Sequence, residues 1–257
     1  MAHHTRLIIL NTTKIGERSL VLHALSPDWG RRSFVAAVPK GGGMALFQPL
    51  GILDAEIVEN PRSDLWRAHA FSARHPLTGL RTSPAKNAMS LFMAEVLWRT
   101  IRDGAREEGL FEWCERSILT LDALEGDFAN YHLRFLLELA AALGFAPSLE
   151  DLMPFAGEHL AQLRALVQSG FSESLLVPLS GGQRSEIAEI LLRYLGYHTE
   201  TRIEARSLRV LREERDQRGP SPRRHPRLHP GGRGCRPRRR QGRRFRPLRE
   251  PDDPQTR

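Results

Sequence analysis

The side chains in this sequence that could do chemistry are cations near turns in the first 40 residues. They are Lys14, Arg18, Arg31, Arg32 and Lys40. Lys and Arg neutralise the phosphates of nucleic acids, and an aromatic side chain among them can stack a base for about 1 to 3 kcal/mol. Trp29 and Phe34 lie close to two of these cations in sequence. The cluster predicts nucleic-acid contact. Taken singly, each cation also fits a solvated surface position, and Phe34 fits a barrel core.

A second motif is LSGGQR at residues 179–184, which resembles the signature of ATP-binding-cassette ATPases. That signature acts beside a phosphate-binding G-x-x-x-x-G-K-[ST] loop, and the sequence contains no such loop. The glycines after Lys40 have the wrong order and spacing. We therefore expect Ser180 to cap a helix that starts near Gln183. A nucleotide hydrolase is the rival function from the enzyme class.

Metal-binding and nucleophile motifs are absent from the sequence. It contains no C-x-x-C, no H-E-x-x-H and no G-x-S-x-G. Cys114 lies on an apolar helix face, where a small core residue is the expected role. His132 borders the most apolar helix, and we expect it to be a surface or capping residue. The sequence thus predicts no metal site, no cofactor and no catalytic residue, so a binding protein is favoured over an enzyme.

The cellular compartment is predicted from the absence of membrane-spanning, secretory and disulfide features in the sequence. Its 257 residues include no apolar run of membrane length and no signal peptide. The two cysteines, Cys114 and Cys235, lie in different surroundings and form no disulfide framework. These features predict a cytoplasmic protein without a membrane partner.

The net charge of +8 is unevenly distributed. Residues 219–257 hold thirteen arginines and three acids, a net charge of +10, so residues 1–218 carry −2. Within this body, residues 1–80 carry +3 and residues 81–218 carry −5. The N-terminal part is therefore the expected face for an anionic partner.

Residues 1–80 are predicted to form a small β-barrel. Short strands are expected at residues 6–11, 19–25, 32–38, 50–58 and 65–71, separated by turn signals such as Pro27-Asp28-Trp29-Gly30. A five-stranded OB barrel is the commonest closed barrel of this size, and its loops and middle strands form the usual nucleic-acid groove. On that groove we place the candidate DNA-binding residues Lys14, Arg18, Arg31, Arg32, Phe34 and Lys40.

Residues 81–218 change to helical periodicity and are predicted to form an all-α domain, which makes the fold class α+β. The centre of this domain is residues 131–147, YHLRFLLELAAALGFAP, apolar nearly all round and therefore buried among other helices. Asn130 fits the N-cap of this helix, and Gly144 fits the position just past its end. Apolar stripes predict further helices near residues 83–104, 109–124, 158–167, 183–195 and 202–214.

Residues 219–257 form a third region, rich in Arg, Pro and Gly, with almost nothing to bury. Such a composition predicts a disordered basic tail. Two origins remain open: an evolved cationic arm, or an altered reading frame at the end of the gene.

Several segments of the chain match the pattern of a known family. The matching segments are residues 6–36 (strand, T-x-x-x-G-E, strand, turn, G-R, strand), 40–41, 48–50, 86–97, 132–147 and 207–212. On these residues the chain resembles the RecO family of bacterial recombination mediators over about residues 5–214. The segment 132–147 is the most specific match, and residues 207–212 fit the Bacteroidetes-like branch best.

The resemblance implies an OB domain followed by a helical domain. It also implies binding of single- and double-stranded DNA, annealing of complementary strands, and help in loading the RecA recombinase in the RecFOR pathway. Implied protein partners are RecR and, in some bacteria, the tail of the single-strand-binding protein. A nucleoid-associated DNA repair role follows, and an OB-fold RNA-binding adapter without catalytic activity is the alternative.

The sequence departs from the family pattern in two places. Many relatives carry four zinc-ligating cysteines after the G-F-A-P segment, whereas residues 148–157 contain none. A zinc role is therefore not expected. The family also lacks the arginine-rich tail, which could add non-specific DNA affinity.

Overall fold

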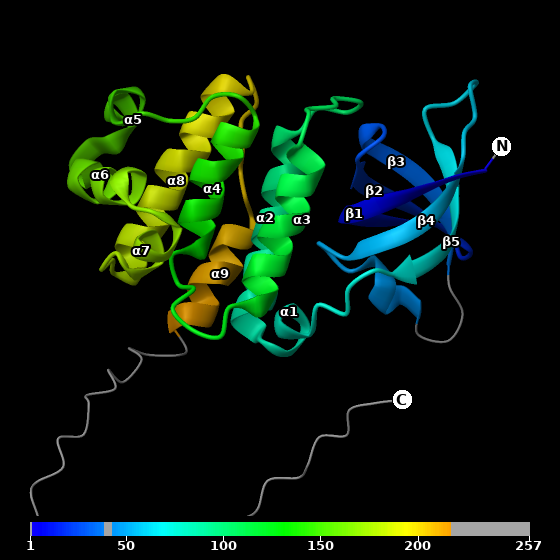
Figure 1. The fold of residues 1–257 in the computed structure, drawn as a ribbon, viewed down its shortest axis with the longest axis horizontal. Coiled ribbons are helices and arrows are strands. Elements are labelled where there is room, and N and C mark those ends of the chain that lie inside the picture. Colours follow the sequence, from blue (N-terminus) through cyan, green and yellow to red (C-terminus); the bar gives the residue numbers. More distant parts are fainter. Residues whose placement is uncertain (1, 39–42, 217–257) are drawn as a thin grey trace, which may run out of the picture. The chain divides into compact units, whose positions relative to one another are not determined.

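The computed structural model describes residues 2–38 and 43–216. All of them belong to one compact unit, Met1–Gly219, in which a β-barrel is followed by helices (Figure 1). The predicted α+β class is confirmed. The predicted boundary between residues 80 and 81 falls inside this unit and stays a prediction. Lys40 and the predicted tail at residues 219–257 lie outside the described residues.

The barrel consists of five strands in the closed order β1-β2-β3-β5-β4, which is the predicted OB barrel. The strands are β1 (Ala2–Ile15), β2 (Ser19–Ser26), β3 (Gly30–Ala37), β4 (Ile52–Val58) and β5 (Trp66–Ala73). Only the pairing of β3 with β5 is parallel. β1 is longer than the strand predicted at residues 6–11, because its first half pairs with β4 and its second half with β2. A short 3-10 helix, η1 (Gly43–Phe47), precedes β4.

In the middle of the first strand, Leu7 to Leu10, both faces are buried. Leu7 and Ile9 point into the barrel core together with Phe34 of β3. Ile8 and Leu10 point the other way and belong to a second core, which the helices supply. Alternate residues of a strand face opposite sides, so a strand that is apolar at every position needs cover on both. The helices therefore pack directly on the outer face of the barrel.

The helices surround one central helix, as predicted. Their bounds are α1 (Thr78–Thr82), α2 (Pro84–Thr100), α3 (Leu110–Ala123), α4 (Tyr131–Ala142), α5 (Leu149–Ala156), η2 (Gly157–His159), α6 (Leu160–Gln168), α7 (Phe171–Leu176), α8 (Gly181–His198) and α9 (Ser207–Asp216). In Figure 1, α4 lies between the α2–α3 pair and α8. Leu133, Leu136 and Leu139 of α4 are at most 1% exposed, which is the burial expected of a helix that is apolar all round.

The two ends of α4 are built differently from each other. Gly144 has a φ of +91°, and the amide of Phe145 donates to the carbonyl of Ala140 at 2.9 Å, as expected for a glycine stop. Asn130 occupies the N-cap position, but its side chain does not cap the helix. Instead its buried Nδ2 donates to the carbonyls of Ser174, Leu175 and Val177. Asn130 thus fastens the end of α7 to the start of α4.

His132 does not lie on the surface. It is 1% exposed, and its ring meets the edge of Phe92 on α2 with 6.0 Å between the ring centroids. The predicted surface position was wrong because this side of the first turn of α4 faces α2, so the polar ring is buried there.

One carboxylate on α2 holds the start of the last helix. Glu95 accepts hydrogen bonds from the amides of Arg206 (3.1 Å) and Ser207 (2.9 Å) and from the Ser207 hydroxyl (2.5 Å). Burial alone would raise the pKa of Glu95, but these bonds and one from Arg99 outweigh it and hold that pKa below its ordinary value. Glu95 therefore satisfies two amide donors at the N-terminal end of α9.

Substitution Glu95→Gln is expected to lower the free energy of unfolding by about 1 to 3 kcal/mol at pH 7, because a charged acceptor is lost. A carboxyl with a lowered folded-state pKa stabilises the fold above its ordinary pKa of 4.5 and loses this effect as the pH falls through the folded-state value. The difference between the two proteins, measured by urea unfolding, should therefore shrink below pH 4.5.

The control is Glu189→Gln, whose ion pair with Arg212 also joins α8 to α9 but is half exposed. An exposed pair contributes less than about 1 kcal/mol. Equal losses in the two variants would contradict the capping role of Glu95.

Ion pairs also join the barrel to the helices. Arg6 of β1 contacts Glu112 at 3.1 Å and Glu115 at 2.5 Å, and its guanidinium lies over the ring of Phe111. All three partners are on α3.

None of the helices in the described part of the chain combines the length and the apolar character that a membrane span requires.

Candidate nucleic-acid interface

The turn between β1 and β2 carries two exposed cations. Lys14 lies near the end of β1, and Arg18 precedes β2, with Gly16 at a φ of +65° between them. Within the described residues neither cation takes part in an ion pair, so both charges are available to an outside anion. We call this turn, with Lys14 and Arg18, the basic hairpin.

Arg31 has a different role from the one predicted. Its guanidinium lies over the ring of Trp98 on α2 at 4.3 Å, and its Nη1 donates to the Trp98 carbonyl at 3.3 Å. The side chain is 14% exposed and lies 3.9 Å from Asp103. Burial lowers the pKa of Arg31. Arg31 therefore joins the barrel to α2, and its predicted contact with DNA stays a prediction for a mostly buried charge.

Arg32 points to one end of the barrel, among aromatic rings. Its guanidinium lies 3.9 Å from the ring centre of Trp66, and the rings of Trp29 and Trp66 meet edge to face at 5.3 Å. His3 packs on Trp29 at 5.0 Å. We call the group His3, Trp29, Arg32 and Trp66 the barrel mouth. Among the described residues no carboxylate pairs with Arg32.

Phe34 is fully buried in the barrel core, with 0% exposure. A base could reach this ring only if the barrel opened, so its expected stacking role is corrected to a core role. Burial follows from alternation along β3, since Phe34 and Ala36 point inward and Val35 points outward.

The four predicted cations that the structure describes, Lys14, Arg18, Arg31 and Arg32, do not form one cluster. Lys14 pairs with Leu20 and Arg32 with Ala24 along the same strand, β2. Four residues of strand separate these points by about 13 Å. The basic hairpin thus lies at one end of the β2–β3 ladder, and Arg31 and Arg32 lie at the other.

Sequence reasoning missed a further exposed cation, Arg67 on β5. It pairs with Val35 in the middle of β3, between the basic hairpin and the barrel mouth. Its neighbours Trp66 and Ala68 pack against the barrel core, so Arg67 points outward. The dipeptide Trp66-Arg67 within a predicted strand was the available signal.

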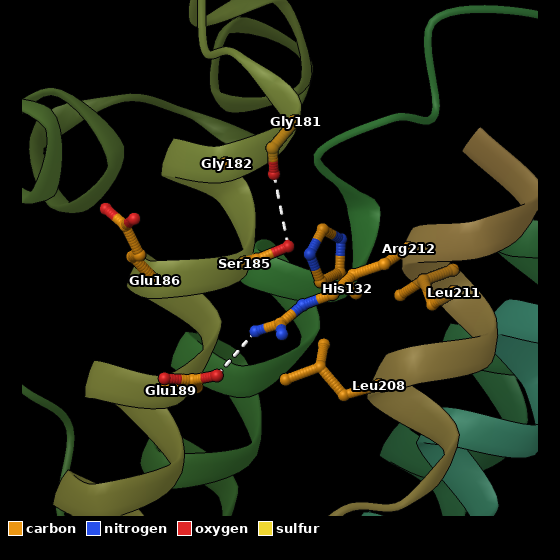
Figure 2. A pocket seen from close by; sticks show the side chains of 9 residues that line it. All are labelled: His132, Gly181, Gly182, Ser185, Glu186, Glu189, Leu208, Leu211 and Arg212. Carbon is orange, nitrogen blue, oxygen red and sulfur yellow. Dashed lines mark hydrogen bonds and ion pairs between the residues drawn. The ribbon is translucent and has the colours of Figure 1, made fainter. Parts of the chain in front are cut away.

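The LSGGQR segment forms the start of a helix, as expected. Ser180 accepts a hydrogen bond from the amide of Gln183, and the Gln183 side chain accepts one from the amide of Ser180. The adjoining cavity of about 410 Å³ also contains Glu186, Glu189 and Arg212 (Figure 2). Because the charge of Arg212 is already paired with Glu189 at 2.5 Å, this cavity is poorly suited to the phosphates of a nucleoside triphosphate.

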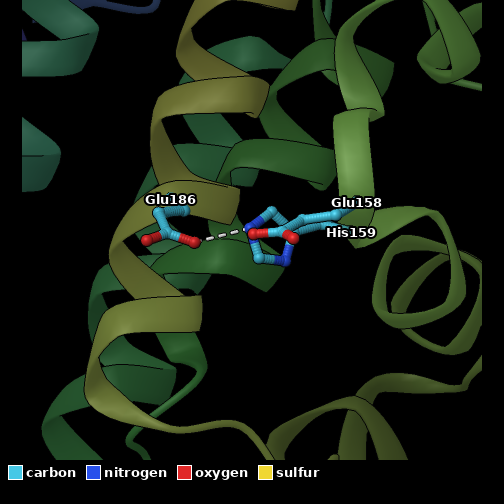
Figure 3. Close-up of side chains that lie close together, drawn as sticks. All are labelled: Glu158, His159 and Glu186. Atoms are coloured by element: carbon cyan, nitrogen blue, oxygen red, sulfur yellow. Dashed lines mark hydrogen bonds and ion pairs between the residues drawn. The ribbon is translucent and has the colours of Figure 1, made fainter.

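One group of side chains has the composition of a metal site. Glu158, His159 and Glu186 each present a possible ligand atom within 4.8 Å of the others (Figure 3). The Nε2 of His159 already contacts Glu186 at 2.6 Å, and Glu158 is exposed. A structural zinc site needs four ligands in a closed shell, and this group supplies three. We interpret it as a hydrogen bond between His159 and Glu186 that joins η2 to α8.

Comparison with known proteins agrees with the architecture. The family model "Recombination protein O C terminal" matches residues 81–152. A protein named DNA repair protein RecO from Bacteroides fragilis is 35% identical over 173 residues, which cover 66% of this chain and 71% of that protein. The chain belongs to the RecO family. A RecO protein from Christiangramia forsetii is 31% identical over 241 residues, covering 83% of this chain and 99% of that protein.

The family predicted from the sequence is therefore confirmed. A third RecO relative, from Phocaeicola vulgatus, is 28% identical over 238 residues, covering 83% of this chain and 99% of that protein. The structure also gives a physical role to residues in three of the matching segments. Glu95 in one segment binds Ser207 in another, and Gly30-Arg31 forms the contact with α2 and the loop after it.

Proposed function

We propose that this chain is a DNA-binding recombination mediator that acts in DNA repair and catalyses no reaction. Membership of the RecO family and the N-terminal OB barrel support this proposal. A binding role also fits the described residues, in which Cys114 is buried in the core and the LSGGQR segment serves as a helix cap.

The observation that carries the proposal is the set of exposed, unpaired cations on the barrel. Lys14 and Arg18 on the basic hairpin and Arg67 on β5 are exposed, and within the described residues none has a carboxylate partner. They stand on a body, residues 1–218, whose net charge is −2. Cations that remain unpaired on an acidic body favour a polyanionic ligand.

The finer steps of the proposed role come from the family. Annealing of complementary strands and assistance in loading RecA within the RecFOR pathway are proposed for this chain. RecR and the tail of the single-strand-binding protein are the proposed partners of the helical domain, residues 81–218. We place the protein with the nucleoid in the cytoplasm.

Reversal of both charges on the basic hairpin, Lys14→Glu with Arg18→Glu, is expected to lower affinity for single-stranded DNA at least about tenfold near 50 mM salt. The slope of the logarithm of the binding constant against the logarithm of salt concentration should also become less negative. The expected change is about 0.7 for each lost phosphate contact, or about 1.4 for both. Fluorescence anisotropy with a labelled oligonucleotide over a salt series measures both quantities.

The matched control is Arg116→Glu with Arg164→Glu, which changes net charge equally at exposed positions on α3 and α6. Both double variants should be measured in the full chain and in a form ending at Gly219, because residues 219–257 carry +10. The proposal that the basic hairpin binds DNA fails under one result. In the form that ends at Gly219, the Lys14→Glu, Arg18→Glu protein would bind single-stranded DNA as tightly as the control protein. Competition between single-stranded DNA and RNA separates this proposal from an RNA-binding adapter.

A further inference from the structure

The barrel mouth contains more than a barrel end requires. Phe34, Leu7 and Leu22 are fully buried and fill the core below it. The mouth adds two tryptophans that remain partly exposed and an arginine that lies on one of them. An apolar side chain would close the end of the barrel without placing a charge there. The combination of an arginine with two partly exposed tryptophans is therefore better explained by ligand binding than by packing alone.

Arg32 is left with unused hydrogen-bonding capacity. The Arg32 Nε is buried without a hydrogen-bond partner, and none of the side-chain nitrogens of Arg32 is hydrogen-bonded to another described residue. The acid nearest the mouth, Asp28, already accepts from Thr5 and contacts His3 at 3.5 Å. A guanidinium stacked on an indole, with free donors at its rim, binds a planar group and an adjacent phosphate.

We propose that the barrel mouth is a subsite for one unpaired nucleobase. The base stacks on the surface formed by Arg32 and Trp29, and the free donors of Arg32 bind the neighbouring phosphate. This inference rests on the proposed function, since it assumes that the barrel binds a nucleic acid strand. A base inside a duplex is already stacked on its neighbours, so the subsite favours single strands.

The position of the mouth fits a strand that also reaches the exposed cations. Arg67 directly follows Trp66, and its partner Val35 lies midway along the ladder to the basic hairpin. About 13 Å of β2 separates the residue that pairs with Lys14 from the residue that pairs with Arg32. OB barrels bind about 4 to 16 nucleotides of single strand, so one strand can occupy both places.

Intrinsic fluorescence of the full chain tests the subsite. The four tryptophans are Trp29, Trp66, Trp98 and Trp113, and residues 219–257 contain none, so binding at the tail alone changes no indole contact. An oligothymidylate of about 15 nucleotides should quench the emission, whereas an abasic strand of equal length should bind without quenching. Stacking of a base on an indole produces the first result and not the second.

Variants locate the effect. Trp29→Leu and Trp66→Leu keep an apolar side chain but remove the aromatic face. Each should weaken oligothymidylate binding about five- to hundredfold and leave abasic-strand binding unchanged. The control is Trp113→Phe, since Trp113 stacks on Phe135 in the helical domain. This variant should bind both the oligothymidylate and the abasic strand as tightly as the unchanged chain.

The outcomes separate the two proposals. If neither strand binds, the proposed DNA-binding function fails and the subsite with it. If the wild-type chain binds both strands equally and shows no quenching, DNA binding stands and the subsite is overturned. Equal weakening of both strands by Trp66→Leu would also overturn the subsite, because the tryptophan would then act only through the fold.

Discussion

Substitution Phe34→Ala is expected to lower the free energy of unfolding by about 3 to 5 kcal/mol, enough to unfold a marginally stable domain. The ring is 0% exposed and packs among the inward side chains of the barrel, so its removal leaves a cavity as well as losing transfer free energy. Urea unfolding, followed by circular dichroism, measures the change.

The matched variant is Phe34→Leu, which keeps most of the apolar volume and should cost clearly less than Phe34→Ala. At temperatures where either variant is fully folded, its affinity for single-stranded DNA should equal that of the unchanged chain, because no base reaches this position. A folded Phe34→Leu protein with weakened DNA binding would contradict the core role and restore the stacking role that the sequence suggested.

The strands could be predicted because alternation is a local property. Phe34 and Ala36 alternate with outward residues, and the Pro27-to-Gly30 turn separates β2 from β3 in sequence and in structure. The closed barrel followed from the number and length of such strands. The burial of Phe34 was therefore available from the same pattern that located β3.

The role of Arg31 could not be predicted from β3 alone. Its outward direction follows from alternation, but what lies outward depends on where α2 docks, and Trp98 is 67 residues away in sequence. A partial signal was present in β1, where Leu7, Ile8, Ile9 and Leu10 are all apolar. A strand apolar at every position requires cover on both faces, which predicts helices on the outside of the barrel.

The helices show the same contrast. α4 was located by its uniform apolarity, and Ser180 was recognised as a cap by its neighbours in sequence. α5 was missed because it buries only Leu152 and Ala156, although Ser148 and Asp151 form a capping box at its start. The target of the Asn130 side chain lies 44 to 47 residues away, so local sequence could not reveal it.

Gly30 lies against the backbone of the loop after α2. Its φ is +62°, and a Cβ atom built on it would lie 1.9 Å from the carbonyl oxygen of Ala105. Backbone atoms cannot yield as a flexible side chain does, so any larger residue must push the two segments apart. That separation would lengthen the hydrogen bond of 2.8 Å that the Gly104 amide donates to the Arg31 carbonyl. It would also weaken the contact between Arg31 and Trp98.

Substitution Gly30→Ala is therefore expected to cost more than about 3 kcal/mol in free energy of unfolding, from backbone strain together with these lost contacts. Gly104→Ala is the matched control, because Gly104 has a similar φ of +71° but nothing within 4 Å of its added Cβ. The control should show only the strain, about 1 to 2 kcal/mol. Urea unfolding measures both variants.

Hydrogen exchange in residues 102–109 gives a second measure of the same contact. Gly30→Ala should speed exchange there, since the Gly104 amide loses its acceptor, while Gly104→Ala should leave the barrel amides protected. Equal costs in the two glycine variants would show that left-handed backbone, and not close packing, requires glycine at position 30. If the costs differ as expected, Gly30 and Arg31 connect the barrel to the helices, and DNA contacts are expected at the basic hairpin, Arg67 and the barrel mouth.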